Sequence, residues 1–274
     1  MRTFSSRRTK AVVSSLIVAG FFSVFIYSFE LMQKNAVNLS GWILLALALV
    51  LTLFNARKKL TYPPLIKSSI WLQFHVYIGW LALLIFFFHT QWQIPNGPLE
   101  SVLYIIFMLL ALSGVLGVFV TRILPKQLAS RGSEVIYERI PMFVRQLREQ
   151  AEQLVLESVG YNNSTILSLF YQQSLESYLS GPSGLTAKII RRDQEYLQLQ
   201  SELKALHRYL TEEECDIADQ LSAIVETKDD LDFHYVRQGV LKYWLFVHIP
   251  LTYSMLLFAL VHLVLVQAFS IGLS

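Results

Sequence analysis

The chain has 274 residues, of which 54% are hydrophobic and 16% are charged, with a formal net charge of +3 and a mean hydropathy of +0.44. This balance excludes an ordinary soluble domain and is typical of polytopic membrane proteins. The single cysteine, Cys215, excludes an internal disulfide, a cysteine-held iron–sulfur cluster and a haem attached through a CxxCH motif. Any redox group must therefore be held by other ligands.

Five apolar runs are long enough, or nearly so, to cross a bilayer as helices. They span residues 11–29, 41–54, 68–88, 102–120 and 243–269. The second run is short, but Trp42 at one end and the basic residues 57–59 at the other are typical of interfacial anchors. The first run follows a basic segment, as in a signal peptide. Its length and the absence of a small-residue cleavage site favour an uncleaved anchor.

The charged residues are segregated along the chain. Of the 20 acidic residues, only Glu30 and Glu100 lie outside residues 123–242, and basic residues flank the apolar runs. The positive-inside rule then places the N-terminus and residues 123–241 in the cytoplasm and the C-terminus outside. We expect an integral protein of a bacterial inner (plasma) membrane, in which the third and fifth runs are parallel.

The predicted fold is all-α, a polytopic membrane helical bundle of about five transmembrane helices with a helical cytoplasmic insertion. Residues 1–122 supply transmembrane helices 1–4, residues 123–241 form the cytoplasmic insertion domain, and residues 242–274 supply transmembrane helix 5.

The insertion has several helix signals. Ser133 is a predicted N-cap for a helix that Pro141 would kink or split and that stops near Gly160. Thr211, followed by three glutamates, predicts a capping box. The helix it opens has no breaker before Gly239, where a bend is expected at most, and continues into the last apolar run. The acidic excess and the lack of nucleotide-binding motifs argue against nucleic acid and nucleotides and favour docking of a protein partner.

Two histidine pairs share one spacing. His75 and His89 belong to the third run and its edge, His248 and His262 belong to the fifth, and each pair is separated by fourteen residues. On a helix, that interval returns to within roughly 40° of the same face and rises about 21 Å. Each helix therefore carries two imidazoles on one stripe, one near each side of a bilayer.

Parallel helices place these histidines at matching depths. His75 would meet His248 near the cytoplasmic side, and His89 would meet His262 near the outer side. Ionisable residues inside a membrane are costly without a partner. Two histidines at each level suit the axial positions of a haem iron, whereas a zinc ion would be left with half of its tetrahedral shell. We therefore expect two b-type haems.

Other residues near the pairs have two interpretations. Gly79, one turn beyond His75, would either let a flat macrocycle approach the backbone or serve helix packing. For the small residues Ser113, Gly114 and Gly117, helix packing is favoured. Pro250 would either aim the imidazole of His248 or be a proline tolerated in a first turn.

The remaining histidines and cations have ordinary explanations. His234 continues the fourteen-residue interval, but no second ligand matches it, so we expect a solvated or salt-bridged residue near Asp232, with a proton or quinone-headgroup role left open. His207 is expected at the surface. Haem propionates or interfacial anchoring would each account for the cations near the cytoplasmic edge. These cations are Arg122, Arg237 and Lys242.

The segments FHVYIGWLALLIFFFHT and LFVHIPLTYSMLLFALVH resemble the haem-ligand helices of the membrane dihaem cytochrome b superfamily, which includes the cytochrome b of quinol:cytochrome c oxidoreductases. The resemblance covers under half of the chain and departs from the family in the large insertion. It implies that His75 with His248, and His89 with His262, are axial ligands of two haems. Since no quinol-site signature matches, it supports haem ligation strongly and a quinone link weakly.

The sequence thus predicts a dihaem b-type cytochrome that transfers electrons across or within the membrane. It would act as a subunit of a respiratory or related oxidoreductase complex and not as a stand-alone enzyme. Its expected partners are membrane lipid and other subunits of that complex, including one docked on the cytoplasmic domain. The alternative hypothesis is a non-redox membrane scaffold or sensor whose cytoplasmic helices bind partners.

Overall fold

The computed structural model describes residues 4–31, 36–56, 68–128, 135–162, 165–182 and 194–271. Within these ranges the protein is all-helical and contains no strand, as predicted. The chain divides into two compact units. Unit 1 comprises Met1–Val118 and Trp244–Ser274, and unit 2 comprises Phe119–Tyr243.

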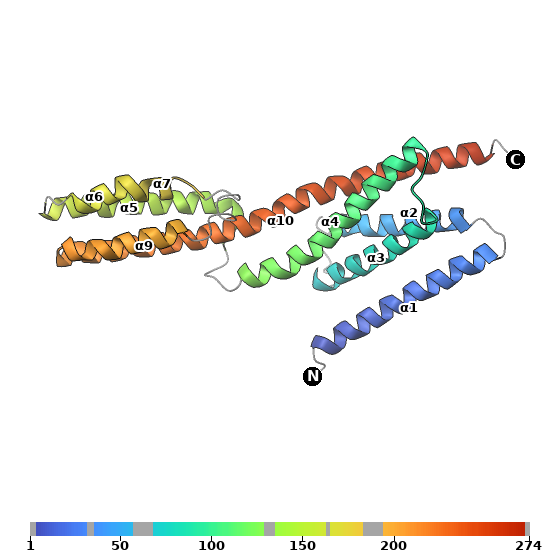
Figure 1. The fold of residues 1–274 in the computed structure, drawn as a ribbon, viewed down its shortest axis with the longest axis horizontal. Helices are drawn as coiled ribbons and strands as arrows, with labels where there is room; N and C mark the ends of the chain where they lie inside the picture. Colours follow the sequence, from blue (N-terminus) through green and yellow to red (C-terminus); the bar gives the residue numbers. More distant parts are fainter. Residues whose placement is uncertain are drawn as a thin grey trace. The chain divides into compact units, whose positions relative to one another are not determined.

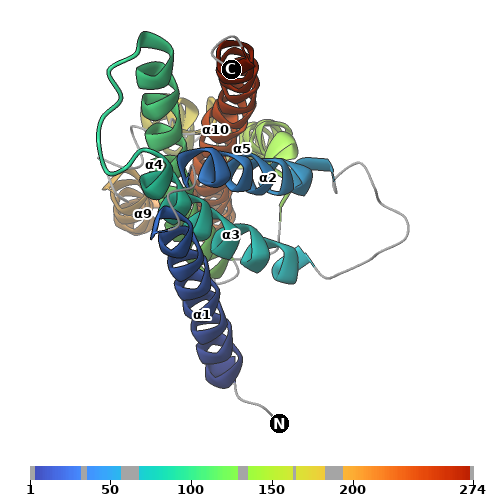
Figure 2. The same cartoon turned by 90° about the vertical axis from the view of Figure 1, so that its right-hand side faces the viewer.

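Unit 1 consists of the long apolar helices. They are α1 (Phe4–Leu31), α2 (Ala36–Ala56), α3 (Ser68–His89), most of α4 (Pro98–Leu128) and the last part of α10 (Glu212–Ile271) (Figure 1). Among the described residues, these five helices are long and apolar enough to cross a membrane. The helices α1, α2 and α3 pack against one another, and α2 and α3 lie side by side (Figure 2).

The second helix is longer than its apolar run. The predicted run covers residues 41–54, whereas α2 has 21 residues and begins at Ala36, before Trp42. The part of α2 that is long and apolar enough to cross a membrane is Ala36–Leu53. The basic residues 57–59, predicted to anchor it, lie outside the described residues.

A tight turn ends α3 directly after His89. Gln91 and Trp92 adopt left-handed backbone angles, with φ of 51° and 59°. The Trp92 amide donates a hydrogen bond to the Phe87 carbonyl at 3.0 Å, which satisfies one of the last carbonyls of the helix. The next helix, α4, opens with Pro98, whose missing N–H costs nothing at the first helical position. Both ends therefore have a local cause in the sequence.

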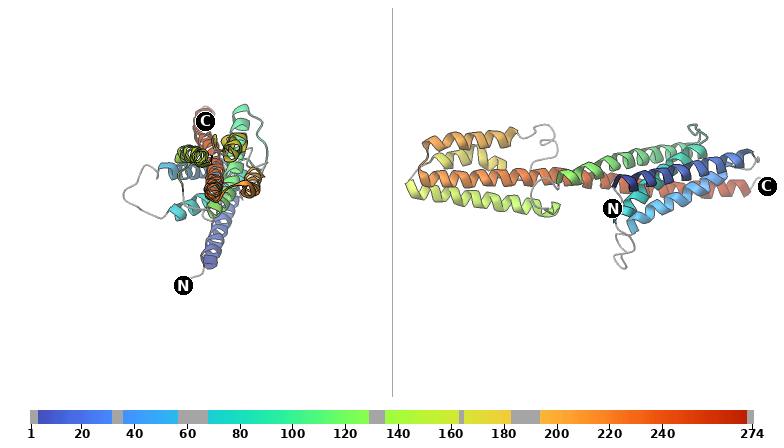
Figure 3. Two further views of the ribbon diagram at one scale, coloured as in Figure 1. Left: turned by 90° about the vertical axis from the view of Figure 1, so that its left-hand side faces the viewer. Right: turned by 90° about the horizontal axis from the view of Figure 1, so that it is seen from below.

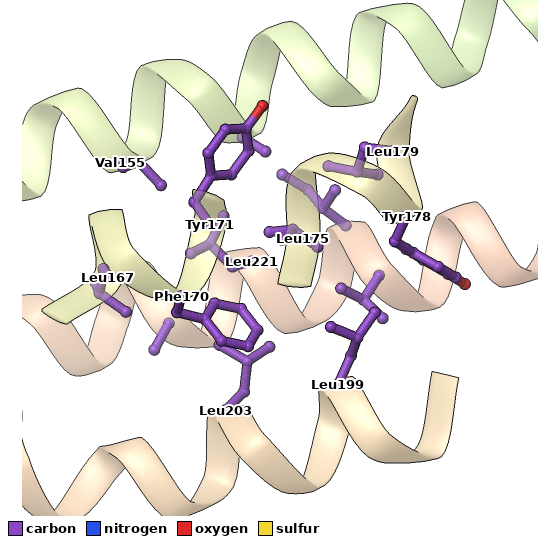
Figure 4. Close-up of a cluster of buried hydrophobic side chains, with 14 of the residues drawn as sticks. Val155, Leu167, Phe170, Tyr171, Leu175, Tyr178, Leu179, Leu199, Leu203 and Leu221 are labelled. Atoms are coloured by element: carbon purple, nitrogen blue, oxygen red, sulfur yellow. The ribbon is translucent and has the colours of Figure 1, made fainter. Parts of the chain in front are cut away.

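Unit 2 is a bundle of helices around its own apolar core. Its segments are η1 (Tyr137–Arg139), α5 (Ile140–Asn162), α6 (Ile166–Phe170), η2 (Tyr171–Leu175), α7 (Glu176–Leu179), α9 (Gln194–Leu206), η3 (His207–Tyr209) and the first part of α10. The segments α5, α6 with α7, α9 and α10 run alongside one another (Figure 3). Figure 4 shows side chains from all of them meeting in one cluster, for example Val155, Phe170, Leu203 and Leu221.

The helix boundaries predicted for the insertion are partly confirmed. Ser133 lies outside the described residues, but residues 135 and 136 are not helical and α5 begins only at Ile140, so the predicted start is wrong. Pro141 therefore sits in the first turn, where proline is tolerated, and does not split the helix. The capping box is confirmed, because the Thr211 amide donates a hydrogen bond to Oε2 of Glu214 at 3.0 Å.

The helix that Thr211 caps runs without interruption from Glu212 to Ile271. It passes through Gly239 and Pro250, so neither residue ends it. Glycine and proline are weak helix formers, but packing of the surrounding side chains outweighs these local costs. His248 and His262, fourteen positions apart, therefore belong to one continuous helix, as their predicted common face requires.

Unit 2 buries an ion pair. Lys228 and Asp232 are 1% and 0% exposed, and Nζ of the lysine lies 2.6 Å from Oδ2 of the aspartate. The same ammonium lies 4.1 Å from the centre of the Tyr178 ring. Burial and the nearby carboxylates of Asp232 and Asp229 raise the pKa of the Tyr178 hydroxyl, which keeps it neutral.

Candidate haem-ligand pairs

The four histidines come together in the two predicted pairs, all within unit 1. His75 on α3 faces His248 on α10, with ring centroids 6.4 Å apart and ring planes at 71°. His89 faces His262 with the same centroid separation of 6.4 Å and a plane angle of 84°. Two sites fourteen residues apart on both helices therefore have nearly identical geometry.

This separation fits two imidazoles on opposite sides of one metal ion. Two metal–nitrogen bonds of about 2 Å, with about 1.2 Å from each nitrogen to its ring centre, give a centroid distance of about 6.4 Å. Edge-to-face packing of two rings falls in the same range of distances. The partners of the second ring nitrogen, Nδ1, distinguish the two arrangements.

In His89, Nδ1 faces the backbone of α2. It lies 3.0 Å from the carbonyl oxygen of Val37 and 3.3 Å from Oγ of Ser40. A carbonyl only accepts, so Nδ1 carries the hydrogen and Nε2 keeps its lone pair for a metal. Gly41 allows this approach, because a Cβ there would come within 2.9 Å of Cε1 of His89. No sequence pattern predicted that α2 contributes to this site.

In His248, Nδ1 lies 3.1 Å from Oγ of Ser113 on α4. The Trp244 indole stacks on the imidazole at 5.2 Å, and its Nε1–H donates a hydrogen bond to the Ser113 carbonyl at 2.8 Å. A Cβ on Gly117 would overlap the Trp244 ring, whereas one on Gly114 would only touch His248 at 3.9 Å. The predicted packing role of these small residues thus extends to orienting a histidine.

In His262, the neighbour of Nδ1 is a carboxylate. Oε1 of Glu100, in the first turn of α4, lies 3.9 Å away. Both side chains are partly exposed. The sequence offered one clue, since Glu100 is one of only two acidic residues outside 123–242.

An apolar layer separates the two pairs. Its buried members are Ala48, Phe86, Phe107 and Met255, one from each of the helices α2, α3, α4 and α10. Phe86 and Phe107 stack face to face, with centroids 3.8 Å apart and planes at 10°. Met255 is seven residues from both His248 and His262. These side chains form a buried apolar cluster in unit 1.

The structure tests the packing interpretation of Gly79. A Cβ at Gly79 would meet no atom within 4 Å, so the residue does not serve close helix packing within the described structure. The space that a Cβ at Gly79 would enter is open.

The other predicted residues have no place in the pairs. His234 is only 2% exposed, so of the two expected states, solvated or salt-bridged near Asp232, the solvated one is wrong. Asp232 itself forms an ion pair with Lys228. Burial in the bundle core overrides the charged neighbourhood of the sequence. His207 is half-buried and lies 3.3 Å from Asp219, near the surface as expected.

The three cations predicted to lie near the cytoplasmic edge belong to unit 2. Lys242 pairs with Glu138 at 3.1 Å, and the bond lowers the pKa of that carboxyl together with a backbone hydrogen bond, which is the larger cause. The guanidinium of Arg237 covers the Phe233 ring at 3.2 Å. Arg122 is exposed. Lys242 and Arg237 thus have an ion pair and an aromatic contact within unit 2.

Among the described residues, no three His, Cys, Asp or Glu side chains are placed to hold one metal ion. A metal at either pair would thus need most of its ligands from a non-protein group, as a porphyrin supplies. No family model, curated protein or solved structure matches the chain. We therefore infer its function from the geometry of the two pairs.

Proposed function

We propose that the protein is a dihaem b-type membrane cytochrome, with His75 and His248 as axial ligands of one haem and His89 and His262 as axial ligands of the other. The observation that carries the proposal is the equal 6.4 Å separation of both pairs. Haem, when bound, supplies a one-electron iron couple. The proposed role is electron transfer within or across the membrane, as a subunit of an oxidoreductase complex.

The chain's own residues hold and insulate the two sites. The Val37 carbonyl accepts a hydrogen bond from Nδ1 of His89, which leaves Nε2 of that ring for iron. The hydroxyl of Ser113 lies within hydrogen-bonding distance of Nδ1 of His248 and orients that ring. The apolar layer around Phe86 and Phe107 would give the path between the two sites a low polarity.

The proposed topology follows the basic residues of the sequence. Five helices cross a bacterial inner membrane, the N-terminus and residues 123–241 face the cytoplasm, and the C-terminus lies outside. The His75–His248 site is then nearer the cytoplasm. Unit 2, with its own core, suits a docking domain for another subunit. We include in the proposal a link to the quinone pool, whose lipid-soluble quinones would serve as electron donor or acceptor.

Single histidine substitutions in the full chain, purified in detergent, test the proposal. In dithionite-reduced minus oxidised spectra, the variants His75→Ala and His248→Ala should retain the bands of one b-type haem. The variants His89→Ala and His262→Ala should retain the bands of the other. His207→Ala is the matched control, because this histidine pairs with Asp219 in unit 2, and it should keep both. Two haems in every variant would refute the ligand assignment. A scaffold or sensor would show no b-type bands at all.

A further inference from the structure

The loop between α3 and α4 exposes two large apolar side chains that take no part in the histidine pairs. Trp92 and Ile94 are 68% and 73% exposed, among the highest values of the large hydrophobic residues that the structure describes. The residues that connect the two helices, 90–97, include no charged side chain. Exposed apolar groups of this kind are covered either by a protein partner or by a lipid surface.

The loop has a defined backbone conformation. The left-handed angles of Gln91 and Trp92 are unfavourable for residues other than glycine, so the surrounding structure must hold them. Besides the bond from the Trp92 amide to the Phe87 carbonyl, the Ser101 hydroxyl donates a hydrogen bond to the Pro95 carbonyl at 2.8 Å. The direction of the Trp92 side chain is therefore set by the fold.

Trp92 turns back along the side of α3. Its indole stacks on the Phe87 ring, with centroids 4.9 Å apart and planes at 10°, and meets the Phe88 ring edge to face at 6.3 Å. Both phenylalanines belong to Ile70–His89, the part of α3 that is long and apolar enough to cross a membrane. The indole thus lies at the depth of the last turn of this span and does not project beyond it.

Exposed aromatic side chains from three other helices lie near the same end of unit 1. Tyr27 of α1, Trp42 of α2 and Phe269 of α10 each lie within about two turns of the helix end that gathers with the end of α3 (Figure 1). Tyrosine and tryptophan are enriched where hydrocarbon meets water, because their rings are apolar and carry one polar group. Together with Trp92, these residues indicate a membrane–water boundary at the level of the loop.

We propose that Trp92 and Ile94 insert the α3–α4 loop into the phospholipid headgroup region at this end of unit 1. The inference rests on the membrane crossing of the proposed function and not on haem. A partner in the aqueous phase would need side chains that project beyond the helix end, whereas Trp92 lies at a depth that lipid surrounds. An uncharged loop loses no charge hydration there, and the indole N–H can donate to lipid carbonyl or phosphate oxygens. The inserted loop anchors the end of α3, at His89.

Spin labels on single cysteines test the insertion in the full chain, reconstituted in vesicles of phosphatidylethanolamine and phosphatidylglycerol. All variants carry Cys215→Ser, which removes the native thiol. Power-saturation EPR compares collisions of the label with oxygen, which concentrates in lipid, and with a nickel chelate, which stays in water. The oxygen-to-nickel ratio should be several-fold higher in Ile94→Cys than in Tyr209→Cys. Tyr209 is the matched control, because it is also 73% exposed but belongs to unit 2.

A third label separates failure of the insertion from failure of the membrane crossing. Phe21 is exposed and lies midway along Val12–Phe29 of α1, so Phe21→Cys should give the highest ratio. Equal ratios in Ile94→Cys and Tyr209→Cys, with a high ratio in Phe21→Cys, would overturn the insertion and leave the crossing intact. A low ratio in Phe21→Cys as well would refute both. If Ile94→Cys does not assemble, Trp92→Cys decides by the same comparison.

Discussion

Gly41 offers a sharp test of how α2 supports the outer pair. A methyl group at Gly41 would lie 2.9 Å from Cε1 of His89, whereas ordinary carbon contacts begin near 3.5 Å. The imidazole of a Gly41→Ala variant must therefore move by roughly 0.6 Å. If it moves away from α2, the 3.0 Å contact of Nδ1 with the Val37 carbonyl lengthens beyond the range of a hydrogen bond.

The expected loss of haem affinity follows from the role of the hydrogen bond between Nδ1 of His89 and Val37. Loss of the partner that orients a ligating histidine weakens metal binding about 10- to 100-fold, or about 1.4 to 2.8 kcal/mol. Gly41→Ala should thus lower occupancy of the His89–His262 haem and leave the other haem unaffected. The effect should be read in a His75→Ala background, which isolates the affected site.

Titration of the apoprotein with haemin, followed by absorbance, gives the affinity in each variant. Gly20→Ala is the matched control, because a Cβ at Gly20 in α1 meets no atom within 4 Å. Wild-type affinity in Gly41→Ala would refute the idea that α2 positions His89. Equal losses in Gly41→Ala and Gly20→Ala would point to general damage to the bundle instead.

Three other substitutions have defined outcomes. Ser113→Ala removes the oxygen beside Nδ1 of His248 and should weaken haem binding there about 10- to 100-fold, with wild-type haemin affinity arguing against that contact. Phe107→Ala should destabilise the bundle by about 3 to 5 kcal/mol in denaturant unfolding, and Phe107→Leu by clearly less; equal losses would contradict a packed layer. Lys228→Met leaves a buried carboxylate and should cost about 3 to 5 kcal/mol, whereas the double variant with Asp232→Leu should recover much of it; additive losses would refute the pairing.

Much of the architecture follows from local sequence signals. Apolar run length predicted the long helices, and Thr211 with its glutamates predicted the start of α10 correctly, because a capping box depends on residues three apart. The start at Ser133 was wrong, because a cap residue competes with tertiary packing that only the folded unit provides. The burial of His234 escaped notice for the same reason.

In the candidate site, too, the features within one helix could be predicted and the contacts between helices could not. The spacing of His75 and His89 is a property of one helix and can be predicted from the sequence. The oxygens of Val37 and Ser113, and the carboxylate of Glu100, reach the histidines across helices that are distant in the chain. No local pattern encodes such contacts, although a lone glutamate among apolar runs was a usable hint.

The most direct test of the central claim is the haem stoichiometry of the purified full chain, measured as the pyridine haemochrome against protein concentration. We expect two b-type haems per chain, falling to one when either histidine pair is broken. A chain that binds none after expression with ample haem supply would contradict it.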